Sequence, residues 1–289
     1  MTSENNKESQ APMYVMLLFV IAVQILSFAL MPTLIASDAR AFQNPQSPEN
    51  PIMYIILVLV FTAVLLLAIR LRRGKLVGAF ILLSVATSIF YILASLIQPV
   101  IALVITVAVL LLLRFYPEWY IIDILGIFIC GGIAALFGIS MTTLPALILL
   151  GVLAVYDAIS VYKTKHMVTL AEGVINIKAP LLFVVPKSRD YSFMREQTIG
   201  KGKGAYFLGL GDAIIPTVLT VSANWSLPAP GVLFGINIPA LGALVGTYLG
   251  FMALMMTSRE KPQAGLPFLN GGTIVGFLAG CAIAGISPI

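Results

Sequence analysis

The sequence predicts an all-α, multi-pass membrane protein with nine transmembrane helices. Of its 289 residues, 60% are hydrophobic and only 10% are charged, and the mean hydropathy is +1.02. Soluble domains average about 45–50% apolar and about 25% charged residues. Apolar runs of about 20 residues, each enough to cross about 30 Å of hydrocarbon, recur along the chain. The basic residues also segregate to alternate connections between these runs, as they do in membrane proteins.

Short polar or proline-containing connections separate the nine expected spans. Their approximate ranges are 12–36, 51–70, 75–97, 99–116, 119–138, 142–163, 203–223, 232–256 and 266–286. The first run is too long for the apolar core of a signal peptide, so we expect it to remain as a span, although residues 35–39 loosely resemble a cleavage site. The connections at 98–99 and 115–119 are tight, which leaves an eight-span alternative open there.

The basic residues also predict the orientation. With nine spans, 16 of the 17 Lys and Arg residues fall on one side of the membrane and only Arg40 falls on the other. Positively charged connections stay in the cytoplasm, so the N-terminus is expected to be cytoplasmic and the C-terminus external. The net charge of +5 then reflects topology and attraction to anionic lipid, and no nucleic-acid partner is needed to explain it.

One connection, residues 164–202, is long, and it is expected on the cytoplasmic side. It divides the chain into an N-terminal part (1–163, transmembrane helices 1–6) and a C-terminal part (203–289, transmembrane helices 7–9) of one membrane-embedded unit. Within it, Phe183-Val184-Val185 favours a β-strand, and the simplest interpretation is a loop packed on the membrane surface. We find no internal repeat of the kind that many transporters carry.

Two acidic residues lie inside strongly apolar segments, Asp157 and Asp212. An ionisable group in hydrocarbon costs several kcal/mol unless it is paired, hydrated or protonated, so it is a functional candidate by default. Asp157 precedes Lys163 by six residues, about 9 Å along a helix, and Asp212 follows Lys203 by nine, about 13 Å along a helix of opposite direction. Both carboxyl groups are therefore expected at one depth, near the cytoplasmic side.

Small residues beside the aspartates predict that the two helices approach closely. Gly209 and Ala205 lie three and seven residues before Asp212, on the same face if this segment is helical. Ala154 and Ser160 flank Asp157 in the same way.

Two carboxyl groups that meet share one proton, because both cannot be ionised cheaply at short range. The ionised group can take a proton from water as the water attacks an amide carbonyl, while the protonated group stabilises the carbonyl oxygen. This chemistry needs no metal, cofactor or nucleophilic side chain. The sequence agrees, since His166 is its only histidine and it has no Cys/His cluster.

At these residues the chain resembles the presenilin and signal peptide peptidase family, the GxGD intramembrane aspartyl proteases, and it is most similar to the archaeal members. The resemblance covers the order of nine spans, the long loop after the sixth, and three motifs: Tyr156-Asp157, Gly209-Leu210-Gly211-Asp212 and Gly265-Leu266-Pro267-Phe268-Leu269. The family's third motif is usually Pro-Ala-Leu, and Phe268 departs from it. Literal Pro-Ala-Leu strings at 145–147 and 239–241 lie at the wrong depth, so we interpret them as coincidental.

The resemblance implies hydrolysis of peptide bonds within the transmembrane helices of membrane-protein substrates. Asp157 and Asp212 would be catalytic, and the supporting or substrate-contacting residues would be Tyr156, Gly209, Leu210, Gly211, Leu266, Pro267, Phe268 and Leu269. A presenilin-like orientation implies type I membrane proteins as substrates, and an archaeal relative implies a prokaryotic cell membrane. Accessory subunits or a homo-oligomer stay open.

The amides of a helix are sheltered by its own hydrogen bonds, so the substrate helix must unwind near the cleaved bond. The strip 181–185 could then pair with the unwound segment as an added strand.

The alternative function is a proton- or cation-conducting channel or transporter, which also uses buried carboxylates. The missing repeat argues against it. Asp123, beside Trp119, is expected to be interfacial and not catalytic. Gly242, Gly246 and Gly250 are expected to form a helix-packing strip and not a binding site.

Overall fold

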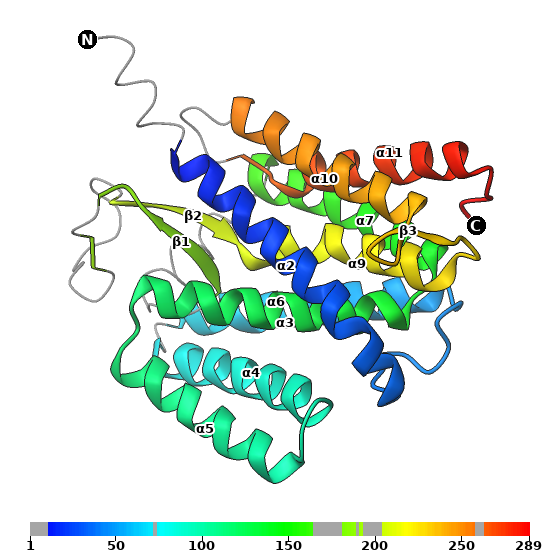
Figure 1. Cartoon of the computed structure of the whole chain (residues 1–289). Coiled ribbons are helices and arrows are strands. Elements are labelled where there is room, and N and C mark those ends of the chain that lie inside the picture. The colour runs from blue at the N-terminus through cyan, green and yellow to red at the C-terminus, as the bar shows by residue number, and fades with distance from the viewer. Residues whose placement is uncertain (1–10, 72–73, 164–180, 189–190, 193–203, 258–262) are drawn as a thin grey trace.

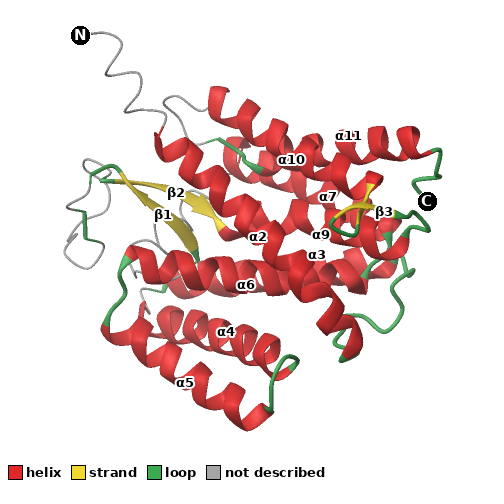
Figure 2. Ribbon diagram, in the orientation of Figure 1, coloured by secondary structure: helices red, strands yellow, loops and turns green. Residues whose placement is uncertain are grey.

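The computed structural model is a bundle of α-helices with two short β-hairpins (Figures 1 and 2). It describes residues 11–71, 74–163, 181–188, 191–192, 204–257 and 263–289. The helices are α2 (Ala11–Ala36), α3 (Glu49–Arg70), α4 (Gly74–Ala94), α5 (Pro99–Phe115), α6 (Trp119–Ser140), α7 (Thr143–Ala158) with the π-helical turn η1 (Ile159–Lys163), α9 (Leu210–Ser226), α10 (Ile238–Thr257) and α11 (Leu266–Ala284). The strands are β1 (Leu182–Pro186), β2 (Ala205–Gly209), β3 (Gly231–Leu233) and β4 (Ile236–Asn237).

The described helices match the multi-pass prediction in its coarse form. Seven of them are long and apolar enough to cross a membrane, namely α2, α3, α4, α6, α7 with η1, α10 and α11. The helix α5 is apolar but shorter. A helix overlaps each of the nine predicted ranges, and two of these helices, α9 and α10, begin seven and six residues later than predicted.

The seventh predicted span, 203–223, is wrong at its start, because residues 205–209 form β2 and the helix α9 begins at Leu210. Gly209 and Ala205 therefore do not form a helical packing strip with Asp212. The eighth, 232–256, begins only at Ile238, because the β3–β4 hairpin precedes it. Asn237 sets that start, since its side-chain oxygen accepts the Ala240 N–H at 2.9 Å as a helix cap.

The β1 and β2 strands pair antiparallel, with Phe183 opposite Leu208, and the predicted strand at 183–185 is confirmed. It is not a loop on the membrane surface: Phe183, Val184 and Val185 are all buried. The Phe183 ring lies 5.2 Å from the Phe19 ring and fits against Gly126 of α6, where a Cβ would stand 3.0 Å from it. We call the end of the bundle that holds these strands the hairpin end.

The register decides which main-chain groups of this hairpin do not bond to the other strand. Lys187 N–H donates to the Gly204 carbonyl at 2.9 Å, so alternate residues on each strand exchange bonds with the other. The residues whose main-chain groups face outward are Leu182, Val184 and Pro186 on β1, and Ala205, Phe207 and Gly209 on β2.

The helices α10 and α11 approach so closely that their main chains touch. A Cβ on Gly242, Gly246 or Gly250 would collide with a main-chain carbonyl oxygen of α11. In each case the two atoms would be closer than the sum of their van der Waals radii. Gly272 and Gly276 of α11 meet α10 in the same way. Such small-residue seams replace the hydrophobic effect as the source of helix packing in lipid. The expected packing strip is confirmed.

Helix α9 lies inside the bundle, in contact with α2, α6, α7, α10 and α11 (Figure 1). Its buried face carries Thr217, Thr220 and Ser222 among apolar residues. The Thr217 and Thr220 hydroxyls donate to carbonyl oxygens of their own helix, and Ser222 donates to the Met141 carbonyl at 2.8 Å. These three hydroxyl groups of the core are thus hydrogen-bonded to main-chain carbonyl oxygens, as buried polar groups require.

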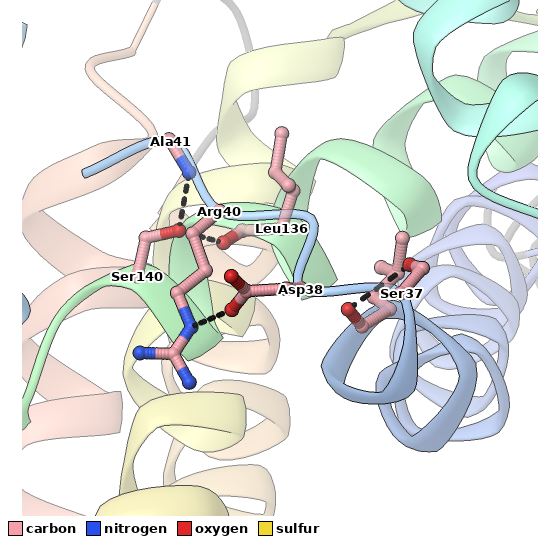
Figure 3. A network of polar contacts seen from close by, with 7 residues as sticks. Ser37, Asp38, Arg40, Ala41, Leu136 and Ser140 are labelled. Carbon is pink, nitrogen blue, oxygen red and sulfur yellow. Dashed lines mark hydrogen bonds and ion pairs between the residues drawn. The ribbon is translucent and has the colours of Figure 1, made fainter. Parts of the chain in front are cut away.

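The opposite end of the bundle has its own polar network (Figure 3). Ser140, the last residue of α6, accepts the Ala41 N–H at 2.7 Å and donates to the Leu136 carbonyl at 2.6 Å. Nearby, Arg40 pairs with Asp38 at 3.3 Å and lies over the Trp225 ring. These contacts fasten the segment after α2 to the ends of α6 and α9.

Candidate active site

Asp157 lies in the last turn of α7, just before the chain changes to the π-helical turn η1. It is buried, with 5% of its surface exposed. Its Oδ2 accepts the Leu266 N–H from the start of α11 at 3.1 Å, and the Gly265 N–H lies within hydrogen-bonding range. The first residues of a helix have unpaired N–H groups, so the start of α11 is a natural partner for a carboxylate.

The η1 turn also reaches the segment that precedes α11. Tyr162 donates from its hydroxyl to Gln263 Oε1 at 2.6 Å and accepts the Ala264 N–H at 3.3 Å. Turns of π-helix occur often at functional sites. Here the turn holds residues 263–264 immediately before the two amides that face Asp157.

Asp212 lies in the first turn of α9, which begins where the β2 strand ends. Gly209 is the N-cap residue, with extended backbone (φ −63°, ψ 136°). Asp212 is the third residue of the helix, and its carboxyl group reaches back to the Gly209 main chain. This is the side-chain half of a capping box, and the helix dipole favours a carboxylate there. The Asp212 side chain is partly exposed.

Gly265 brings the two carboxyl groups to one place. A Cβ on Gly265 would stand 3.0 Å from each of Cγ, Oδ1 and Oδ2 of Asp212. The next residue, Leu266, holds Asp157. The two carboxyl groups are also close enough to interact electrostatically. The two aspartates therefore lie close together although they come from different helices, α7 and α9.

The remaining predicted residues surround this pair. Leu210 is buried against Gly126, and Gly211 is exposed with no atom near its missing Cβ. Pro267 occupies the first turn of α11, and Leu269 is fully buried. The others are a partly exposed Tyr156, beside Asp157, and Phe268, whose carbonyl packs on Gly250.

The two literal Pro-Ala-Leu strings lie away from the site. Pro145 lies in the first turn of α7, twelve residues and about 18 Å before Asp157. Pro239 is the second residue of α10 and packs against Gly280, near the far end of α11. Their interpretation as coincidental agrees with the structure. His166 lies outside the described residues.

Three polar residues make contacts that the sequence did not predict. Asp123, expected to be interfacial and not catalytic, is 3% exposed and accepts the Val184 N–H of β1 at 2.8 Å, a contact that the sequence did not predict. Asn270 is fully buried and donates to the Leu150 carbonyl of α7 at 2.9 Å. Tyr162 was not singled out. A lone Asn in an apolar run was the available signal for Asn270, whereas Tyr162 gave none.

Among the described residues no three His, Cys, Asp or Glu side chains converge as metal ligands do. What the arrangement offers is a pair of carboxyl groups, one buried and one partly exposed, held by main-chain N–H groups from helix starts. Such a pair can take up and release a proton during attack by water.

Comparison with known proteins identifies the family. Residues 16–286 match the family described as signal-peptide peptidase, presenilin aspartyl protease. Two solved structures of a presenilin family intramembrane aspartate protease are similar throughout. The one in space group C222 is 38% identical with a TM-score of 0.67, covering 94% of this chain and 98% of that one. The one in space group P2 is 39% identical with a TM-score of 0.68, covering 95% and 99%. No curated protein matches the sequence. The chain belongs to the presenilin and signal peptide peptidase family and is an intramembrane aspartic endopeptidase.

Proposed function

We propose that Asp157 and Asp212 are the catalytic pair of this intramembrane protease. The observation that carries the proposal is their meeting at Gly265-Leu266, where one residue holds Asp157 and its neighbour lies against Asp212. The supporting residues are Tyr156, Gly209, Leu210, Gly211, Leu266, Pro267, Phe268 and Leu269.

In this mechanism the pair shares one proton at rest. The ionised carboxylate takes a proton from water as the water oxygen bonds to the amide carbon, and the protonated carboxyl gives its proton to the carbonyl oxygen. Collapse of the resulting diol breaks the C–N bond: the leaving nitrogen takes the proton of the protonated carboxyl group, and a diol hydroxyl gives its proton to the other carboxylate. The products are a carboxylic acid and an amine, and the pair again holds one proton.

Cleavage of a transmembrane substrate in liposomes, by the wild type and by Asp157→Ala and Asp212→Asn, tests the pair. We expect cleavage by the wild type only. Wild-type turnover by either variant would end the proposal. Ion flux that survives both substitutions, with no cleavage by the wild type, would instead support the channel alternative.

Gly265→Ala tests the close approach of α11 to the pair. The added methyl group would press on all three atoms of the Asp212 carboxyl group, which must turn away. Because a displacement of about 1 Å can cost 100-fold, we expect kcat to fall by about 10- to 100-fold. Thermal stability should change little, since a side chain and not main chain gives way. Unchanged kcat, measured beside Gly271→Ala in the same helix, would contradict this.

We further propose nine spans with a cytoplasmic N-terminus and an external C-terminus, arranged as one catalytic unit of parts 1–163 and 203–289 joined by the 164–202 loop. Support comes from the 16-to-1 distribution of basic residues. The two helices below usual spanning length, α5 and α9, each have 17 residues, about 26 Å. The dyad then opens toward the cytoplasm, and a prokaryotic cell membrane is the proposed location.

The sequence favoured the 181–185 strip as the strand that pairs with an unwound substrate. We propose that the substrate pairs instead with the free edge of β2. No described strand lies beyond β2, and its outward groups include those of Gly209, beside Asp212. An unwound substrate segment paired there would run past the catalytic pair, with main-chain bonds replacing those of its helix.

Phe207→Pro tests this edge. Proline removes an outward N–H without touching the bonds to β1, and edge strands tolerate it. We expect KM to rise by about 3- to 10-fold, the loss of one hydrogen bond of about 1 kcal/mol, with kcat less affected. Unchanged kinetics toward a transmembrane substrate would count against the β2 edge. Thermal unfolding of the variant checks that the hairpin survives.

A further inference from the structure

Asp123 is an acidic residue inside a membrane-spanning helix that the catalytic mechanism does not use. It lies in the second turn of α6 and is almost fully buried. Its Oδ1 accepts the Val184 N–H at 2.8 Å, and its Oδ2 has no hydrogen-bond partner among the described residues. A buried carboxyl group with one bond is costly to keep. The structural role of Asp123 is therefore to be sought in its one hydrogen bond, which holds Val184 of β1.

The bond occupies a main-chain N–H on the outer edge of β1. The outward-facing residues of this strand are Leu182, Val184 and Pro186. Asp123 takes the Val184 N–H, and Pro186 has none. Edge strands are commonly blocked by proline or by an inward-pointing charge, so that no other strand adds to them. This side of the hairpin is fastened to α6, and β2 keeps the edge that can pair.

The same bond lies on a short path to the catalytic pair. Val184 stands opposite Phe207 of β2, and β2 ends two residues later at Gly209. Gly209 is the N-cap of α9 and contacts Asp212. The hairpin is therefore fixed at one side by Asp123 and at the other by the start of the catalytic helix.

We propose that Asp123 is a positioning residue that anchors the β1–β2 hairpin to α6 and so sets which substrate peptide bond reaches the dyad. The inference rests on the proposed dyad. Asp123 itself touches no substrate. Its loss lets the hairpin shift relative to α6, which moves the strand that aligns the substrate.

The test compares Asp123→Ala with Asp123→Asn in the full-length protein, using a transmembrane substrate whose products are identified by mass spectrometry. Asn keeps an oxygen that can accept the Val184 N–H, and Ala does not. We expect Asp123→Ala to move or spread the cleavage positions and to lower kcat by about 10- to 100-fold, as misplacement by about 1 Å does. Asp123→Asn should keep the wild-type positions. Wild-type positions and kcat in Asp123→Ala, or equal defects in both variants, would overturn the proposal.

Ser140→Ala is the matched control, because Ser140 also uses a side-chain oxygen of α6 to hold a distant main-chain N–H (Figure 3). It lies 17 residues further along, about 26 Å from Asp123. We expect Ser140→Ala to lower thermal stability about as much as Asp123→Ala does, but to leave the cleavage positions unchanged. Shifted positions in Ser140→Ala would show that general loosening suffices, and would overturn a special role for Asp123.

Two measurements keep the inference separate from the dyad and from folding. If Asp212→Asn stays active, the dyad fails; if it is inactive while Asp123→Ala cleaves normally, only this inference fails. Should Asp123→Ala not fold, amide hydrogen exchange in the wild type decides. We expect the Val184 amide to exchange more slowly than the Leu182 amide, although both face away from β2. Equal exchange would overturn the anchor.

Discussion

Replacing Asp212 by Asn is expected to lower kcat for a transmembrane substrate by about 10³- to 10⁴-fold, the range for loss of a general acid or base. An amide can neither take the proton of the attacking water nor return it. Asp157→Asn should have an equal effect for the same reason. The double variant should be no worse than either single variant, because residues that work as a unit lose their function together.

The measurement is turnover at saturating substrate, with the products quantified by mass spectrometry. Asp38→Asn is the matched control, since Asp38 is an exposed aspartate at the opposite end of the bundle. It should turn over at the wild-type rate. A double variant whose loss equals the product of the two single losses would show that the aspartates act independently, and would contradict a shared proton.

Gly246→Ala is expected to have the largest effect on stability. Its Cβ would occupy the space of the Gly272 carbonyl oxygen, and main chain cannot turn aside as a side chain can. The two helices must separate along the whole seam, so we expect the free energy of unfolding to fall by about 3 kcal/mol or more.

Gly271→Ala supplies the comparison in the facing helix. Nothing lies within 4 Å of a Cβ at Gly271, so alanine costs no contact. Its better helix propensity should make this variant neutral or more stable by up to about 1 kcal/mol. Both are measured by chemical unfolding in detergent micelles. Equal stabilities of the two variants would show that the close seam between α10 and α11 does not hold in solution.

Features that depend on solvent and on helical spacing were predictable from the sequence. The apolar runs gave the order of the helices, because hydrocarbon leaves helices as the only open spanning structure. The segment from Asp157 to Lys163 is helical, as the sequence count assumed. The strip of Gly242, Gly246 and Gly250 followed from helical periodicity, and its partner is α11.

The start of α9 could not be predicted in this way. The segment 205–209 is apolar enough to continue a helix, but pairing with β1 makes it a strand. That pairing joins residues across the 164–202 connection, and no local pattern encodes a partner so far away. The predicted depth of Asp212 was reached by counting along a helix that does not exist there.

The burial of Asp123 could not be predicted for a related reason. Its position near Trp119, at a span end, is typical of interfacial residues. What makes it internal is the hairpin, which covers the start of α6 and brings the Val184 amide to the carboxyl group. Tyr162 is similar, because its partners lie about a hundred residues later, before α11.

The seam between α10 and α11 also restricts the path by which a substrate helix travels sideways out of the lipid. Where two main chains touch at Gly242, Gly246 and Gly250, no side chain can swing aside to open a passage. A helix about 10 Å wide would have to break that contact along its length. The wall formed by α10 and α11 is therefore a fixed barrier, and lateral access to the aspartates must use a different face of the bundle.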